Sequence, residues 1–247
     1  MSHNLHKYLS KIFTATCLFI FTNLSAQNFA LKNFPLTDNN TRASINCIYK
    51  ISNGYIYAGT TNGLYKFDGE KYYPVLFKNP DFRDTVTAIF EDSNKLLWIG
   101  FQNGRIANLI KGKLEYYNPE EGTPTKKITA FIEDIHRNLW FASYGEGLYV
   151  LSKGRMYLFD SNDGLTDVNI NALETTQQGE ILVATDQGIQ ICSFPGQKKI
   201  VGYAGSKEGL TDLLITSIKK ISENEFCIGS ESGAVFSYDH THKKLVL

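Results

Sequence analysis

The chain has 247 residues, of which 43% are hydrophobic, and its 25 basic and 25 acidic residues give a formal net charge of zero. This charge balance gives no reason to expect a nucleic-acid partner, because proteins that bind nucleic acid usually carry an excess of basic residues. After the first 26 residues, no segment is apolar for long enough to cross a bilayer as a helix.

Residues 1–26 have the organisation of a secretory signal peptide. Lys7 and Lys11 make the start basic, residues 12–24 are mostly apolar, and Ser25 and Ala26 are small residues suited to cleavage. An uncleaved anchor is the alternative interpretation of the same segment. We therefore expect the folded part to cover residues 27–247 and to be periplasmic or extracellular.

The rest of the chain is a fivefold repeat. The only two tryptophans, Trp98 and Trp140, both stand twelve residues after the start of a copy, and a glycine such as Gly63 or Gly104 stands eighteen after it. The intervals between starts are 41, 42, 42 and 45 residues. The five copies start at Ile45, Val86, Ile128, Ile170 and Ile215. A period of this length is typical of β-propeller blades.

Each copy predicts four strands. In the first, an alternating apolar run over residues 45–51 is followed by a turn, a short apolar strand, an Asn62-Gly63 hairpin, a third strand and a fourth strand at residues 72–75. Alternation indicates strands, and Asn-Gly favours a tight hairpin because both residues tolerate positive φ. The predicted fold is therefore all-β: a β-propeller of four-stranded antiparallel blades, with five blades in this chain.

The two ends of the repeat region bear on ring closure. Residues 28–36 stand where a fourth strand precedes every later copy, so they are a possible ring-closing strand. The fifth copy nevertheless has a fourth strand of its own at residues 243–247. We expect an incomplete ring, with at least one blade outside this sequence. A five-bladed ring with residues 29–34 packed elsewhere is the competing interpretation.

Several of these motifs resemble two-component regulator propeller repeats. The resemblance is carried by EDSNKLLWIG at residues 91–100, EDIHRNLWFA at 133–142, TNGLYKFDG at 61–69 and DGLT at 163–166. Copies four and five lack the Glu-Asp pair and the tryptophan, and Arg105 replaces the usual leucine.

This resemblance implies a seven-bladed ring that forms the extracytoplasmic sensing region of a membrane-bound histidine kinase or hybrid two-component regulator, a kind of protein common in Bacteroidetes. The chain would then be a sensor fragment whose parent protein carries the kinase region.

Three common catalytic or phosphate-binding motifs are missing from the sequence. It contains no P-loop, no Gly-x-Ser-x-Gly elbow and no His-Glu-x-x-His. We interpret residues 160–164 (DSNDG) as a turn rather than a calcium loop, and His240 and His242 as solvated rather than metal-binding. The Glu-Asp pairs recur at one blade position, which favours a turn or capping role. We predict no catalytic residue, no cofactor and no metal for this chain.

Candidate ligand-binding residues are those that depart from the repeat in the loop between second and third strands, where function on a repeat scaffold is usually found. We expect this loop to face the same end of the ring as the connections between blades, which add Asp81, Arg83 and Lys207. The main candidates are Phe101, Gln102, Arg105, Tyr144, Glu146, Asp186, Gln187 and Glu231.

The predicted function is ligand sensing without catalysis. The expected partner is a small molecule or oligosaccharide, or another domain of the same signalling protein, with no nucleic acid. Two alternatives stay open. One is a secreted propeller scaffold for protein–protein interaction, and the other is a secreted carbohydrate-active enzyme.

Overall fold

A computed structural model describes residues 32–38, 41–78, 84–119 and 122–246 of the chain. The chain divides into residues 1–35 and a compact unit over residues 36–247, and the fold below is that of the second unit. The predicted signal peptide and residues 28–31 of the possible ring-closing strand lie outside the described residues. Residues 32–36 form no strand, and β1 (Thr37–Asp38) pairs with β2 (Thr41–Arg42).

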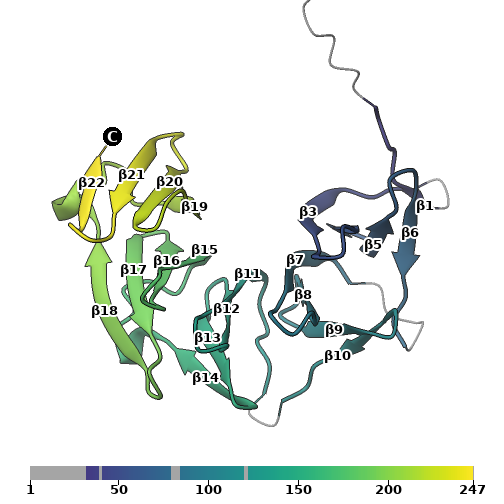
Figure 1. The fold of residues 1–247 in the computed structure, drawn as a ribbon, viewed down its shortest axis with the longest axis horizontal. Coiled ribbons are helices and arrows are strands. Elements are labelled where there is room, and N and C mark those ends of the chain that lie inside the picture. The colour runs from purple at the N-terminus through teal and green to yellow at the C-terminus, as the bar shows by residue number, and fades with distance from the viewer. Residues whose placement is uncertain (1–31, 39–40, 79–83, 120–121, 247) are drawn as a thin grey trace, which may run out of the picture. The chain divides into compact units, whose positions relative to one another are not determined.

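Five four-stranded antiparallel sheets follow one another along the chain, each with its strands in sequence order (Figure 1). The predicted all-β propeller blades are confirmed. Blade one has β3 (Ile45–Lys50), β4 (Ile56–Thr60), β5 (Gly63–Phe67) and β6 (Tyr72–Val75); blade two has β7 (Val86–Glu91), β8 (Leu97–Phe101), β9 (Ile106–Ile110) and β10 (Lys113–Tyr116); blade three has β11 (Ile128–Glu133), β12 (Leu139–Ser143), β13 (Gly147–Ser152) and β14 (Arg155–Phe159); blade four has β15 (Ile170–Thr175), β16 (Ile181–Thr185), β17 (Gly188–Ser193) and β18 (Lys199–Ala204); blade five has β19 (Ile215–Lys220), β20 (Glu225–Ser230), β21 (Val235–Asp239) and β22 (Lys244–Val246).

Successive blades are joined through their first strands by one repeated side-chain hydrogen bond. In blades one to four, the side chain of the second residue of the first strand donates to the backbone carbonyl of the first residue in the next blade. Its donor is Asn or Thr, so the side chain is short and the blades must approach closely. The four bonds run from Asn46 Nδ2 to Val86 (2.9 Å), Thr87 Oγ1 to Ile128 (2.7 Å), Thr129 Oγ1 to Ile170 (2.8 Å) and Asn171 Nδ2 to Ile215 (2.9 Å).

The core lies between blades, where first-strand side chains pack on the preceding sheet. Val86 and Ile128 are fully buried in this way. A Cβ built on Gly100 would lie 2.5 Å from the Ile128 side chain, which explains why this slot of the repeat takes only small residues. The first strand of the first blade is less covered: Ile45, the counterpart of Val86, is 42% exposed, and Ile48 is 63% exposed whereas its counterpart Ile89 is only 9% exposed.

The Glu-Asp pairs of blades two and three hold turns, as predicted. Asp134 is buried and accepts hydrogen bonds from the backbone N–H groups of His136 (2.8 Å) and Asn138 (2.9 Å) and from the Trp140 indole (2.8 Å). Asp92 makes the equivalent bonds to its own turn and to Trp98. The preceding glutamates reach back to the neighbouring blade, Glu91 to Ser52 and Glu133 to Ser93.

Three further sequence expectations fall within the described residues. The expectation that His240 is solvated is wrong, because His240 is buried and its Nε2 lies 2.8 Å from Glu180 Oε2, whereas His242 is exposed. Asp160 caps the short 3-10 helix η1 (Ser161–Asp163), so the DSNDG segment is a capped turn. No helix of the described residues is both long and apolar enough to span a membrane.

Candidate functional site

Each blade has two ends, and the loops at them differ in kind. At the loop end of each blade, the residue that follows the blade's second strand donates its backbone N–H to a backbone carbonyl. The acceptor is the residue just before the first strand of the same blade. These five bonds are Thr61 to Ser44, Gln102 to Thr85, Tyr144 to Lys127, Asp186 to Asn169 and Glu231 to Leu214, at 2.9–3.3 Å. The predicted proximity of these loops to the blade connections is therefore confirmed. The turns between strands one and two, and between three and four, form the opposite, turn end.

At the loop end, three polar side chains from blades three and four meet. The Tyr144 hydroxyl donates to Asp186 Oδ2 at 2.9 Å, and Asn171 Nδ2 donates to Asp186 Oδ1 at 2.9 Å. Tyr144 is 40% exposed, so solvent reaches the group. Its hydrogen bond to the Asp186 carboxylate raises the pKa of Tyr144 above the ordinary value. We call Tyr144, Asp186 and Asn171 the loop-end triad.

A second polar group lies at the loop end of blade two. The Arg105 guanidinium lies 5.0 Å from the centre of the Tyr116 ring, whose hydroxyl donates to Asp84 Oδ2 at 2.7 Å. Asn103 Nδ2 donates to the same oxygen at 3.1 Å. Burial, followed by the bond to Asp84, raises the pKa of Tyr116 to about 12. Arg105 therefore stabilises a packed aromatic ring as well as facing solvent.

Other candidates from the sequence are placed differently. Phe101 is fully buried and its ring packs against Phe77 and Tyr116. It is therefore a core residue that a ligand cannot reach. Glu146 is engaged by neighbouring residues of the loop end, where it accepts hydrogen bonds from Thr125 in the connection before blade three and from Ser143 at the end of β12.

The remaining candidates are not brought into either group. Gln102 and Glu231 are exposed, and Lys207 lies in the short 3-10 helix η2 (Ser206–Glu208). The backbone carbonyl of Gln187 accepts the Tyr203 hydroxyl at 2.5 Å. Asp81 and Arg83 lie outside the described residues.

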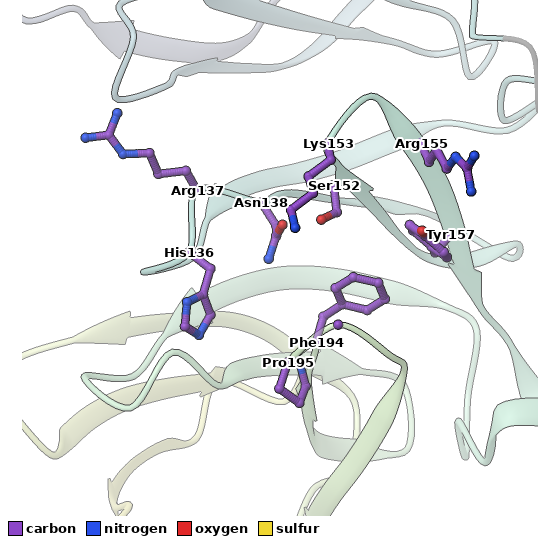
Figure 2. A pocket seen from close by; sticks show the side chains of 10 residues that line it. His136, Arg137, Asn138, Ser152, Lys153, Arg155, Tyr157, Phe194 and Pro195 are labelled. Atoms are coloured by element: carbon purple, nitrogen blue, oxygen red, sulfur yellow. The ribbon is translucent and has the colours of Figure 1, made fainter.

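The turn end carries a cleft that the sequence reasoning missed. It has a volume of about 790 Å³ and lies where the turns of blade three meet the last turn of blade four (Figure 2). Its size is within the range usual for small-molecule sites. The lining residues are basic, polar or aromatic: His136, Arg137, Asn138, Ser152, Lys153, Arg155, Tyr157, Phe194, Pro195 and Gly196.

An elongated turn of blade four forms one wall of this cleft. In blade three only Lys153 and Gly154 connect the third and fourth strands, whereas residues 194–198 make the equivalent connection in blade four. The Phe194 ring is buried and packs 4.8 Å from the Tyr157 ring. This contact fixes the turn over the last strand of blade three.

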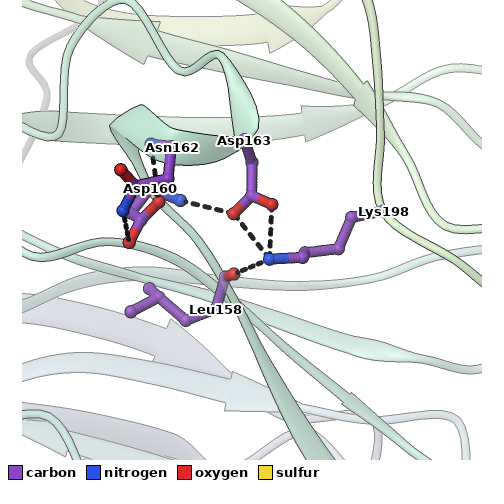
Figure 3. A network of polar contacts seen from close by, with 5 residues as sticks. All are labelled: Leu158, Asp160, Asn162, Asp163 and Lys198. Atoms are coloured by element: carbon purple, nitrogen blue, oxygen red, sulfur yellow. Dashed lines mark hydrogen bonds and ion pairs between the residues drawn. The ribbon is translucent and has the colours of Figure 1, made fainter.

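The other side of the elongated turn is held by Lys198 (Figure 3). Its ammonium group donates to the Leu158 carbonyl at 2.8 Å and contacts both oxygens of Asp163, at 2.5 and 2.6 Å. Burial alone would raise the pKa of Asp163, but Lys198 and the Asp160 N–H lower it below the ordinary value. The capped turn at residues 160–163 therefore anchors the wall of the cleft.

A sequence signal for the cleft existed in the spacing of the repeats. The fourth copy is followed by the fifth after 45 residues, whereas the other intervals are 41 or 42. Part of the excess is the elongated turn of blade four. The candidate residues predicted from the repeat lie in the loop between second and third strands, whereas this departure lies at the opposite end of the blade.

The site residues do not suggest a metal centre. Among the residues that the structure describes, no three His, Cys, Asp or Glu side chains are grouped so that they could hold a metal ion. Each oxygen of the Asp186 carboxylate instead already accepts one hydrogen bond.

Comparison with known proteins identifies structural neighbours only. No family model matches the chain, and no curated protein matches it. Among solved structures, the extracellular domain of a putative one component system from B. thetaiotaomicron is 23% identical with a TM-score of 0.71, over 87% of this chain and 29% of that one.

Two further neighbours widen the comparison. The extracellular domain of a putative hybrid two component system from B. thetaiotaomicron is 19% identical with a TM-score of 0.64, over 84% of this chain and 31% of that one. Virginiamycin B lyase from Staphylococcus aureus is 13% identical with a TM-score of 0.62, over 87% of this chain and 75% of that one.

The chain thus spans about 30% of the length of the two B. thetaiotaomicron structures. At these identities the neighbours establish the β-propeller fold. Two of them are extracellular domains of signalling systems, in agreement with the resemblance to two-component regulator propeller repeats.

Proposed function

We propose that this chain is an extracytoplasmic sensing module of a two-component signalling protein, and that it binds its ligand at the loop-end triad without catalysis. The observation that carries the proposal is the convergence of Tyr144 and Asp186, which come from different blades and both depart from the repeat. Core residues recur in every blade because the fold needs them. Residues that differ between blades and meet at an exposed loop are where binding is expected.

The chemistry of the triad suits a neutral, hydroxyl-rich ligand. A carboxylate oxygen can accept more than one hydrogen bond, so Asp186 retains acceptor capacity after binding Tyr144 and Asn171. The half-exposed Tyr144 ring offers an apolar surface beside these polar groups. A small oligosaccharide presents both features, hydroxyl groups at its edges and apolar ring faces.

Two lines of support favour sensing over the alternatives. The B. thetaiotaomicron neighbours are extracellular domains of signalling systems. The lyase neighbour shares the fold, but the triad offers only one carboxylate and no histidine. A sensor of this kind acts by binding one conformational state of its parent protein more tightly than another.

The proposal is tested by thermal unfolding of the purified chain with a panel of neutral oligosaccharides, followed by calorimetric titration of any that stabilise it. A ligand at 100 times its dissociation constant stabilises the folded state by about 2.7 kcal/mol, which raises Tm by several degrees. We expect at least one oligosaccharide to do so and to be recovered chemically unchanged.

The site is tested by Asp186→Asn, with Glu231→Gln as the matched control. Glu231 occupies the same loop position in blade five. We expect Asp186→Asn to weaken binding at least tenfold and Glu231→Gln to leave it within twofold. Equal effects of the two variants would contradict the triad as the site. A stable protein complex with no oligosaccharide binding would instead favour a secreted scaffold.

A further inference from the structure

We propose that the turn-end cleft between blades three and four is a second binding site, specific for a ligand that carries at least two oxyanion groups on a ring-sized frame. This site is independent of the loop-end triad. Its ligand class follows from the charges, the aromatic wall and the shape of the cleft.

The charge of the cleft is one-sided. Arg137, Lys153 and Arg155 line it together with His136, and none of its lining residues is acidic. Within the described residues, none of these four side chains has a salt-bridge partner. Three like charges gathered around one cavity repel one another, so an anion that enters it relieves that repulsion. Arg and Lys are also the side chains that bind sulfate, phosphate and carboxylate groups best.

Blade two provides an internal comparison for this arrangement. Lys95 and Lys111 match Arg137 and Lys153, since all four adopt positive φ at the same turn positions, with φ between 49° and 67°. Lys113 likewise matches Arg155.

The two blades differ at the residue two positions after Lys113 or Arg155. In blade two it is Glu115, which pairs with Lys78 at 3.4 Å, whereas in blade three it is the uncharged Tyr157. Positive turns are therefore a property of the repeat. Their collection in a cleft that lacks a carboxylate belongs to blades three and four.

The positions of the cationic groups indicate more than one anionic contact. In Figure 2 the Lys153 side chain and Asn138 lie at the middle of the group, whereas Arg137 and Arg155 extend at opposite sides. A single small anion could contact only part of this set. A ligand with two or more oxyanions could contact Lys153 and one arginine together.

The residues of the cleft wall are the reason we expect the ligand to have a ring-sized frame. Tyr157 and Pro195 present apolar surface with the buried Phe194 ring behind them, while Ser152 and Asn138 add hydrogen-bonding groups. Pyranose and aromatic rings both pack well on such a wall because one face of each is apolar. The cavity of about 790 Å³ is large enough for a disaccharide-sized molecule.

The test is calorimetric titration of the purified chain at low ionic strength with sucrose octasulfate, sucrose and inorganic sulfate as the probes. We expect sucrose octasulfate to bind at least 100-fold more tightly than either inorganic sulfate or sucrose. Raising the salt concentration should weaken this binding, since exposed charges are screened. Equal binding of sucrose and its octasulfate would overturn the charge argument, and equal binding of sulfate and the octasulfate would overturn the ring-sized frame.

The location is tested with two matched double variants. Lys153→Gln with Arg155→Gln removes charge at the cleft, and Lys111→Gln with Lys113→Gln removes the same charge from blade two. All four side chains are exposed, so both proteins are expected to fold. The first variant should weaken binding of sucrose octasulfate at least tenfold and the second by no more than twofold. Equal losses would show non-specific attraction and overturn the proposal.

Discussion

The turn ends of blades two and three carry the same kinds of residue at matching positions and yet form different surfaces. Both carry a buried or half-buried aspartate that holds a tryptophan, and both carry three basic residues at matching turn positions. Blade two has Glu115, which pairs with Lys78, two positions after Lys113, and the blade that follows it has a short turn between its third and fourth strands. Blade three has Tyr157 instead and faces the long turn of blade four. The comparison shows that the repeat places basic residues at the turn ends. The length of the turn in the following blade then determines whether these residues line a cleft.

The largest effect on this comparison is expected from Asp134→Ala. The substitution leaves the Trp140 indole and the turn N–H groups without their acceptor in a buried place, where each unsatisfied group costs about 1–3 kcal/mol. We expect a loss of about 4 kcal/mol in the free energy of unfolding, measured by urea denaturation.

Asp92→Ala is the matched control in blade two. Asp92 is half-buried rather than buried, so its N–H partners can recover hydrogen bonds from water. We expect this variant to lose less than half as much stability as Asp134→Ala. A larger loss from Asp92→Ala would contradict the role assigned to burial.

Phe194→Ala is expected to have the next largest effect. Phe194 is buried and its ring lies against Tyr157, so truncation removes the contact that holds the long turn in place. Phe-to-Ala changes in cores cost about 3–5 kcal/mol, and we expect about 3 kcal/mol here because the site is near the surface. Urea denaturation measures the loss, and the exposed neighbour Pro195→Ala serves as control. Equal losses would show that the ring contact is not what holds the turn.

Much of this architecture could be predicted from the sequence, and the reasons are physical. The slots filled by Trp98, Trp140 and Gly100 repeat because one packing problem is solved at every junction between blades. The role of Asp134 also followed from its recurrence at the same blade position as Asp92.

The cleft could not be predicted in the same way, because it depends on contacts between residues of adjacent blades. Tyr157 and Phe194 are 37 residues apart in the sequence, and neither is unusual alone. Phe101 shows the converse, since its departure from the repeat pattern reflects core packing and not binding. Sequence patterns identify exceptions, but burial decides which of them a ligand can reach.

Lys198→Met tests the second anchor of the long turn and is expected to have a smaller effect. Its pair with Asp163 is partly exposed, so we expect a loss of no more than about 1 kcal/mol at pH 7. The pair also makes the effect depend on pH. Because the folded pKa of Asp163 lies below the unfolded value, the stabilisation is fully present above that unfolded value, near 4.

As the pH falls through the folded pKa, Asp163 takes up a proton and this stabilisation disappears. Urea denaturation at several pH values should therefore show the wild type and Lys198→Met converging below about pH 4. A difference that stays constant from pH 7 to pH 3 would contradict the ion pair as its source.

The smallest effect is expected from Tyr144→Phe at the loop end. It removes one exposed hydrogen bond to Asp186, which contributes about 1 kcal/mol or less to folding. We expect stability to change little, while the affinity for a neutral oligosaccharide that binds the loop-end triad falls. An unchanged affinity, measured by calorimetric titration, would remove Tyr144 from the proposed site.

The most direct test of the account is Tyr157→Glu, which gives blade three the carboxylate that blade two has at Glu115. The measurement is the dissociation constant of sucrose octasulfate by calorimetric titration, for the wild type and this variant. The account predicts at least a tenfold weaker affinity, because the new carboxylate lowers the positive charge of the cleft, together with a lower unfolding temperature, because the ring contact with Phe194 is lost. Unchanged affinity in a folded variant would contradict the claim that the difference between these two blades creates a binding site.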